Sequence, residues 1–200
     1  MTNYRQLTEK EIAAITVYGC SAENWKNVTV AEKFSPDFVS NVHFSGEIHL
    51  GTYDKTFEMP GGLIKHSGIY NCCLHNCTIG NDVYIDKIHN YIANYTIQDG
   101  TYIENVNIMI VDGYSTFGNG ITVPVMNEGG GREIPIFDYL SAPLAYIQTL
   151  YRHRHELIHH LHDLIDDYAN SLKSNNGTIG SKVKIVNCGS IKNVRIGNCA

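Results

Sequence analysis

The sequence predicts a mainly β repeat fold that is interrupted by one long α-helix. Two observations lead to this prediction. An apolar side chain recurs every six residues from position 79, and an amphipathic helical pattern follows from about 141 to 172. The 200 residues are enough to bury a core, either as one domain with an insertion or as two small domains.

The six-residue period forms two rows of side chains. The first row is Ile79, Ile85, Tyr91, Ile97, Ile103 and Met109, and the second, two positions earlier, is Cys77, Val83, His89, Tyr95, Thr101 and Asn107. Residues two apart in a strand face the same side, so both rows are expected to point inward from short strands. In "IHNYIANY", Ile88 and Ile92 compete with the larger residues for the inward places, which predicts a register slip there.

The period divides the chain into four segments. We expect an N-terminal helical cap over 1–40, repeat coils over 41–126, a glycine-rich loop and long helix over 127–177, and resumed coils over 178–200. Thr8 and Glu11 have the spacing of a capping box for a helix over 7–18. Because the last segment stops in the middle of a repeat, we expect a fragment of a longer chain with further domains, or an end covered by another subunit.

The helical pattern predicts one continuous helix from about Ser141 to Leu172. Its apolar residues alternate in steps of three and four, with Arg154 in the one polar place, which is typical of a heptad seam. A second row of leucines widens the apolar face on one side: Leu150, Leu157 and Leu164. A single amphipathic helix of this length needs a surface to pack on, so we expect a homo-oligomer or packing on its own coils.

The same helix contains "HELIH" (His155 to His159), the spacing of a zinc-metalloprotease site. The protease reading needs a third ligand, and neither a later Glu nor the required Gly and His follow the motif. The sequence therefore predicts no protease and no metal centre. The alternative is a metal site or a pH-sensitive contact on one flank of the helix, formed by His155, His159, His162 and Asp166.

A second candidate site is the loop "NEGGGRE" (127–133). Glycine permits close backbone approach to an anion and Arg132 supplies bidentate recognition, so the candidate ligand-binding residues are Asn127, Gly130 and Arg132. The competing interpretation is a flexible exit from the repeat into the helix, because two carboxylates flank the arginine.

Composition excludes several classes of protein. The formal net charge of -5, without a basic run, argues against nucleic-acid binding. No segment has the roughly twenty apolar residues of a membrane span, and the N-terminus lacks the pattern of a signal peptide. The six cysteines do not have the spacing of a secreted disulfide framework, so a cytoplasmic location is expected.

The hexamers "TIGNDVYI", "TIQDGTYI" and "TIGSKVKI" resemble the hexapeptide-repeat superfamily. More loosely, "FSGEIHLG" and "NEGGGREIPIFDYLSAPLAY" followed by the long helix look like the N-terminal part of a large uncharacterised family of bacterial hexapeptide-repeat proteins. The resemblance implies a left-handed parallel β-helix, with a trimer as the favoured oligomer, and it implies acyl transfer from acetyl-CoA or another acyl-CoA in many members.

Carrying the acyltransferase activity over requires a histidine as general base, and His89 is the best match because it lies inside the repeat. Two hypotheses follow. One is a non-catalytic module that oligomerises or positions other domains, and the alternative is a CoA-dependent acyltransferase acting on a sugar or sugar nucleotide. The helical seam that continues to Leu172 favours the assembly module.

Overall fold

The computed structural model describes residues 3–125 and 129–200 of the chain. It contains two compact units. Unit 1 is formed by Met1–Asp112 together with Asn176–Ala200, and unit 2 by Gly113–Asn175. Each unit is described by itself below.

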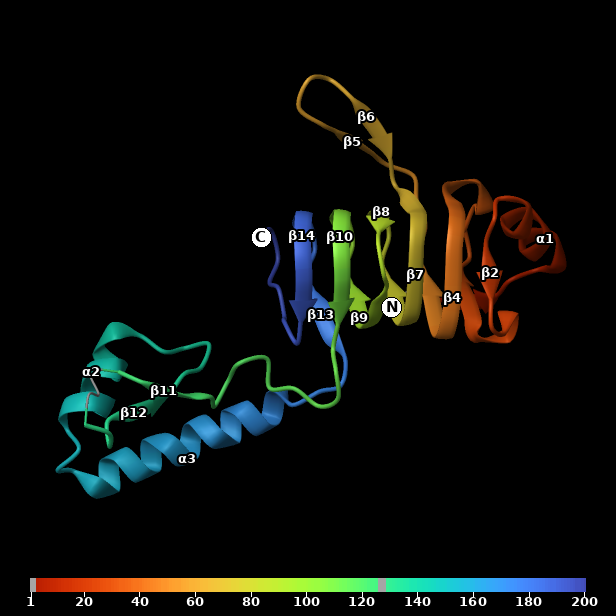
Figure 1. Cartoon of the computed structure of the whole chain (residues 1–200). Helices are drawn as coiled ribbons and strands as arrows, with labels where there is room; N and C mark the ends of the chain where they lie inside the picture. The colour runs from red at the N-terminus through yellow and green to blue at the C-terminus, as the bar shows by residue number, and fades with distance from the viewer. Residues whose placement is uncertain (1–2, 126–128) are drawn as a thin grey trace. The chain divides into compact units, whose positions relative to one another are not determined.

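Unit 1 is built on one sheet in which all strand pairs but one are parallel (Figure 1). Among the described strands of this sheet, the antiparallel pair is β1 with β3. The strands of the sheet are β1 (Tyr4–Gln6), β2 (Ser21–Ala22), β3 (Val28–Ala31), β4 (Val39–Leu50), β7 (Gly68–Ile79), β8 (Tyr84–Ile88), β9 (Ile92–Ile97), β10 (Tyr102–Ile110), β13 (Gly177–Ile179) and β14 (Lys184–Lys192).

Four of these strands close on themselves. Strand β7 pairs with β8, β8 with β10, β10 with β9, and β9 again with β7. The result is a closed four-stranded parallel barrel, and the remaining strands extend the sheet outside it.

The predicted fold class, a left-handed β-helix solenoid with one inserted helix, is therefore wrong. The period of six indicates which side chains face inward and where the chain turns. It does not specify which strands pair with each other. Inward and outward residues alternate along every strand of a barrel as they do in a solenoid, so the periodicity cannot choose between the two. The pairing of β7 with both β8 and β9 decides for the closed barrel.

Most residues of the six-residue rows lie in the core of unit 1, but Asn107, which was predicted to face inward, is exposed. The fully buried members include Cys77, Ile79, Val83, Ile85, Tyr95, Ile97, Thr101, Ile103 and Met109. At the irregular stretch Ile88 and Ile92 are buried, whereas His89 and Tyr91 are exposed, so the predicted register slip is confirmed. Tyr95 fits inside because Gly177 lies against its ring, and its hydroxyl donates to the carbonyl of Val194 at 3.1 Å.

Asparagine forms many of the bends within the strands of unit 1. Asn41, Asn71, Asn76 and Asn94 all have positive φ, a conformation that asparagine tolerates better than most residues. Their side chains form hydrogen bonds with neighbouring segments of the chain. Asn76, for example, accepts from the backbone N–H of Glu47 at 3.0 Å. The polar residues between the apolar rows therefore supply both the turns and the bonds that join them.

The N-terminal segment contains α1 (Glu9–Val17), which is capped as predicted. Thr8 accepts from the backbone N–H of Glu11, and the Glu11 carboxylate accepts from the backbone N–H of Thr8. Two single 3-10 turns follow in the same segment, η1 (Trp25–Asn27) and η2 (Pro36–Phe38). The segment 1–40 also contributes strands β1, β2 and β3 to the sheet.

One hairpin projects from unit 1 between β4 and β7 (Figure 1). Its antiparallel strands are β5 (Thr56–Glu58) and β6 (Ile64–His66). Phe38 and the ring of His66 stack at 3.9 Å, which joins the base of the hairpin to η2.

Unit 2 contains the short antiparallel strands β11 (Thr122–Pro124) and β12 (Glu133–Pro135) and two helices, α2 (Ala142–Leu150) and α3 (His155–Leu172). The prediction of one continuous helix is wrong, because the chain leaves helical geometry between Leu150 and His155. The guanidinium Nε of Arg152 donates to the Gln148 carbonyl at 2.8 Å, which satisfies a group left open by the break. Among the described residues, no helix is long and apolar enough to cross a membrane.

Candidate functional site

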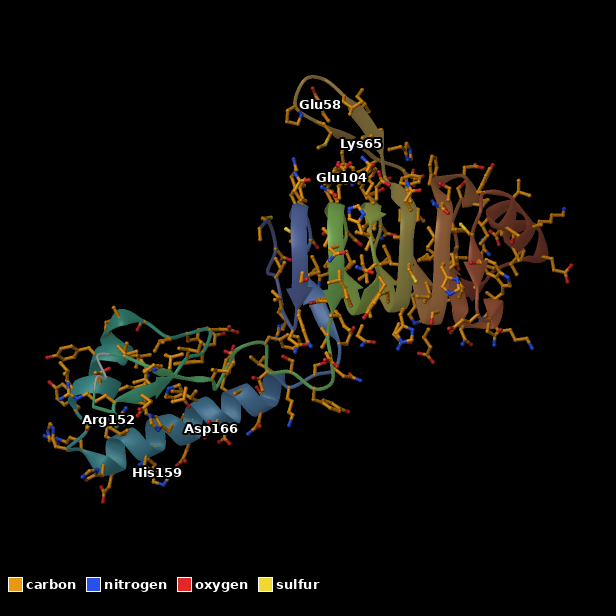
Figure 2. All side chains as sticks on the ribbon, viewed as in Figure 1. Glu58, Lys65, Glu104, Arg152, His159 and Asp166 are labelled. Carbon is orange, nitrogen blue, oxygen red and sulfur yellow. The ribbon has the colours of Figure 1, made fainter. Side chains whose placement is uncertain are left out.

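The candidate metal residues lie on α3, but they do not form a ligand set. His155, His159 and Asp166 are exposed, and His159 and Asp166 are labelled in Figure 2. Nδ1 of His159 lies 3.2 Å from Oδ1 of Asp163, one turn further along the helix. Within residues 3–125 and 129–200, no three His, Cys, Asp or Glu side chains have an arrangement that could hold a metal ion.

His162 differs from the other histidines of α3 because it is partly buried. Burial lowers its pKa, and the positive charge of Arg152 lowers it further. Within the described part of the chain, its Nε2 is buried without a hydrogen-bond partner, as are both amide atoms of Gln148 on α2. These groups are polar members of the interior of unit 2.

The glycine-rich loop does not present a free anion site in the part that the structure describes. Gly130 and Arg132 are exposed, and Asn127 lies outside the described residues. The backbone N–H of Gly131 donates to Oε2 of Glu133 at 3.1 Å. One backbone N–H of the loop is therefore paired with the loop's own carboxylate.

His89 lies on the surface of unit 1. Its Nε2 is 2.8 Å from Oδ1 of Asn105, and its backbone N–H donates to the carbonyl of Val106. Both contacts join the end of β8 to β10.

Unit 2 exposes several large apolar side chains. Helix α3 buries Ile158, Ile165 and Ala169, yet it leaves Leu157 and Leu164 exposed by 45% and 69%. These two leucines are seven residues apart, about two turns, and so lie on one side of the helix. Unit 2 also exposes other large apolar side chains: Tyr114, Ile121, Tyr139, Tyr146, Leu150 and Tyr151.

Unit 2 thus carries eight of the fifteen exposed large apolar side chains of the described residues, although it is less than a third of the chain. Scattered single apolar residues are normal on a protein surface, whereas contiguous apolar patches mark interaction sites. We call Leu157 and Leu164 of α3 the leucine face.

The charges of α3 are unevenly distributed along the helix. Arg154 is the N-cap residue and makes no capping hydrogen bond, while Asp163, Asp166 and Asp167 lie in the second half and no basic residue lies in the last turn. A cation at the N-terminus of a lone helix is unfavourable, because that end carries the positive pole of the helix dipole.

A second polar cluster lies in unit 1, beside the hairpin (Figure 2). Lys65 of β6 contacts Glu104 of β10 at 2.6 Å, and Glu104 also accepts from Lys87 at 3.1 Å and from the hydroxyl of Tyr102. Burial by itself would raise the pKa of Glu104, but these hydrogen bonds outweigh it and lower the pKa from 4.5 to about 2. Spacing in the sequence contains no signal for this cluster, because Lys65 lies on an excursion outside the repeat.

Comparison with known proteins places the chain in context. The family model described as "Domain of unknown function (DUF4954)" matches residues 4–200. An "Uncharacterized protein" of Treponema pallidum (strain Nichols) is 26% identical over 205 residues, which cover 97% of this chain and 28% of the relative. The chain therefore spans less than a third of the length of that relative. No solved structure matches the chain.

The matched family corrects the expected resemblance to the hexapeptide-repeat superfamily, which is wrong. The hexamers that carried the resemblance describe short strands with apolar residues two apart, and a closed parallel barrel requires the same pattern. The expectations that rested on the resemblance, including a transferase, a bound acyl-CoA, a trimer and His89 as general base, lose their support with it.

Proposed function

The chain belongs to the DUF4954 family, and from that premise we propose that it is a non-catalytic assembly module whose leucine face docks against a second copy of the same chain. The observation that carries the proposal is the exposure of Leu157 and Leu164, which lie roughly 100–120° around α3 from its buried residues. Burying each leucine in an interface would contribute roughly 1.5–3 kcal/mol.

A second copy fits the leucine face because the face is complementary to itself in the antiparallel direction. A two-fold axis near the middle of α3 places Leu157 of one copy against Leu164 of the other. In such an isologous contact each leucine is used twice.

The charges of α3 favour the same arrangement. An antiparallel copy brings the half that holds Asp163 and Asp167 alongside the end that holds Arg154. Opposite charges then face each other across the contact, and the acidic half of the second copy compensates the cation at the N-terminus of the first.

The experiment is sedimentation velocity of the chain at protein concentrations from micromolar to several hundred micromolar. It is repeated with two single variants, one substituted in unit 2 and one in unit 1. We expect reversible self-association, weakened at least about tenfold by Leu164→Glu, because a charge replaces an apolar contact. Leu63→Glu is the matched control, since Leu63 is 58% exposed in the hairpin of unit 1. A chain that stays monomeric throughout, or equal weakening by both variants, would rule the proposal out.

A further inference from the structure

Unit 1 contains a cavity of about 260 Å³ between the hairpin and the strands beside it. Phe57, Glu58 and Met59 line it from the hairpin side. The opposite side is lined by Gly100, Tyr102, Lys182, Val183 and Lys184. Ligand pockets for drug-sized molecules usually measure about 300–1,000 Å³, so a cavity of this size fits a smaller molecule.

The cationic side of the cavity follows from the register of three strands. Tyr84 of β8 pairs with Tyr102 of β10, and Tyr102 pairs with Lys184 of β14. The two tyrosine rings stack at 4.6 Å, whereas the third position holds a lysine whose ammonium lies 5.6 Å from the centre of the Tyr102 ring. The ladder therefore ends in a positive charge at the wall of the cavity.

The lysines near the cavity fall into two groups. Lys65 and Lys87 both pair with the single carboxylate of Glu104. Lys182 and Lys184 are exposed and form no ion pair within the described part of the chain. Their side chains both line the cavity, so its charge differs from that of the chain as a whole.

The rest of the lining is mostly apolar. Phe57 and Met59 are partly buried, Val183 is buried, and Phe57 contacts the Tyr102 ring edge to face at 5.3 Å. Glu58 is the one carboxylate of the lining, against two ammonium groups. A single anionic head is therefore favoured over a polyanion.

From these observations we infer that the cavity binds a small organic anion. Its phosphate or carboxylate head lies between Lys182 and Lys184, and its flat apolar body lies against Phe57 and Met59. The inference is independent of the proposed self-association, because every residue that it uses belongs to unit 1.

The experiment measures binding of phenyl phosphate to the whole chain by isothermal titration calorimetry, with inorganic phosphate and benzyl alcohol in separate titrations. We expect phenyl phosphate to bind with a Kd of about 1 mM or lower, and each of the other two to bind at least about tenfold more weakly, since each lacks half of the recognised group. Raising the salt concentration should weaken the binding of phenyl phosphate, because the ammonium groups are exposed.

The substitutions are Lys184→Met, which removes the charge and keeps the length of the side chain, and Lys26→Met as a control. Lys26 is an exposed lysine on η1, outside the cavity lining. We expect Lys184→Met to weaken binding roughly threefold to tenfold and Lys26→Met to leave it unchanged. The inference would be overturned if the two variants had equal effects, or if inorganic phosphate bound as tightly as phenyl phosphate. It would also be overturned if phenyl phosphate did not bind at a concentration of about 10 mM.

Discussion

The ammonium of Lys65 lies 2.6 Å from Oε1 of Glu104, and this contact ties the β5–β6 hairpin to strand β10 of the barrel. Both side chains are largely buried, with 19% and 12% of their surfaces exposed. Ion pairs on open surfaces contribute little to stability, whereas removing one partner of a shielded pair leaves the other without compensation.

The first prediction concerns Glu104→Gln. The pKa of Glu104 is lowered from 4.5 to about 2 in the folded chain, so its contribution to stability is fully present above pH 4.5 and is lost as the pH falls towards 2. We expect the substitution to lower the free energy of unfolding at pH 7 by about 1–3 kcal/mol and to have little effect near pH 2.

Urea denaturation at several pH values measures this effect. Glu58→Gln is the control, because Glu58 is an exposed glutamate on the same hairpin. An equal loss in both variants, or a loss from Glu104→Gln that persists unchanged at pH 2, would show that the ion pair does not stabilise the hairpin.

The second prediction concerns the close approach of the backbone at Gly51 to the backbone at Gly80. A Cβ at Gly51 would lie 2.5 Å from the carbonyl oxygen of Gly80, a backbone atom that cannot rotate away. Gly51→Ala should therefore destabilise the chain by about 1–3 kcal/mol. Gly189→Ala, whose Cβ would meet nothing within 4 Å, should be close to neutral. Urea midpoints that shift equally for the two variants would contradict the packing at Gly51.

The third prediction orders the cysteines by reactivity. Cys199 is exposed, while Cys20, Cys72 and Cys77 are buried. Burial raises the thiol pKa of these three, that of Cys77 to about 12. Because the thiolate is the reactive form, Cys199 should react with a disulfide reagent at pH 8 first, and the buried three only when unit 1 unfolds. Loss of the fast phase in Cys199→Ser is the check, and fast reaction of Cys77 in the folded chain would contradict its burial.

The fourth prediction concerns His162. Burial and the nearby Arg152 lower its pKa in the folded chain, while Asp163 and Asp166 oppose that shift and His159 adds to it. A histidine with a lowered pKa binds fewer protons in the folded state than in the unfolded state. The folded state therefore keeps its full stability above the ordinary pKa of 6.5, and it loses stability as the pH falls below 6.5 towards the lowered pKa of His162.

His162→Gln should therefore flatten the decline in helical stability of unit 2 between pH 7 and 5.5. Thermal unfolding followed by circular dichroism at 222 nm measures it. His160→Gln is the control, since His160 is exposed on the same helix. If His160→Gln flattens the decline as much as His162→Gln, the buried imidazole is not its cause.

Several features of the fold could be predicted because they depend on neighbours in the sequence. The capping box of Thr8 and Glu11 needs only a spacing of three residues, and it is present. The inward rows were predicted from the alternation of strand residues, and Ile79, Ile85 and Ile103 are fully buried. The slip at Ile88 and Ile92 was predicted because His89, Tyr91 and Tyr95 are large for the inward positions, although Tyr95 is in fact fully buried.

The candidate site was harder to predict because its residues come from separate elements. His155, His159, His162 and Asp166 are close in sequence, and yet their side chains do not converge on a metal. The reverse holds for Lys65 and Glu104, which are far apart in sequence and meet through the hairpin. It also holds for Lys184 and Tyr102, which meet through the strand register. The exposed Leu164 was predicted to widen an apolar face, but its exposure depends on what unit 2 packs against.

The sequence by itself determined most of the residues that turn inward, where helix α1 begins and which leucines share one side of α3, because each follows from the geometry of a single strand or helix. Only the tertiary structure decided that β7 pairs with both β8 and β9 to close a barrel, and that the helical pattern breaks before His155. The physical reason is that hydrogen bonds between strands join residues distant in the chain, and the same inward pattern satisfies more than one way of pairing them.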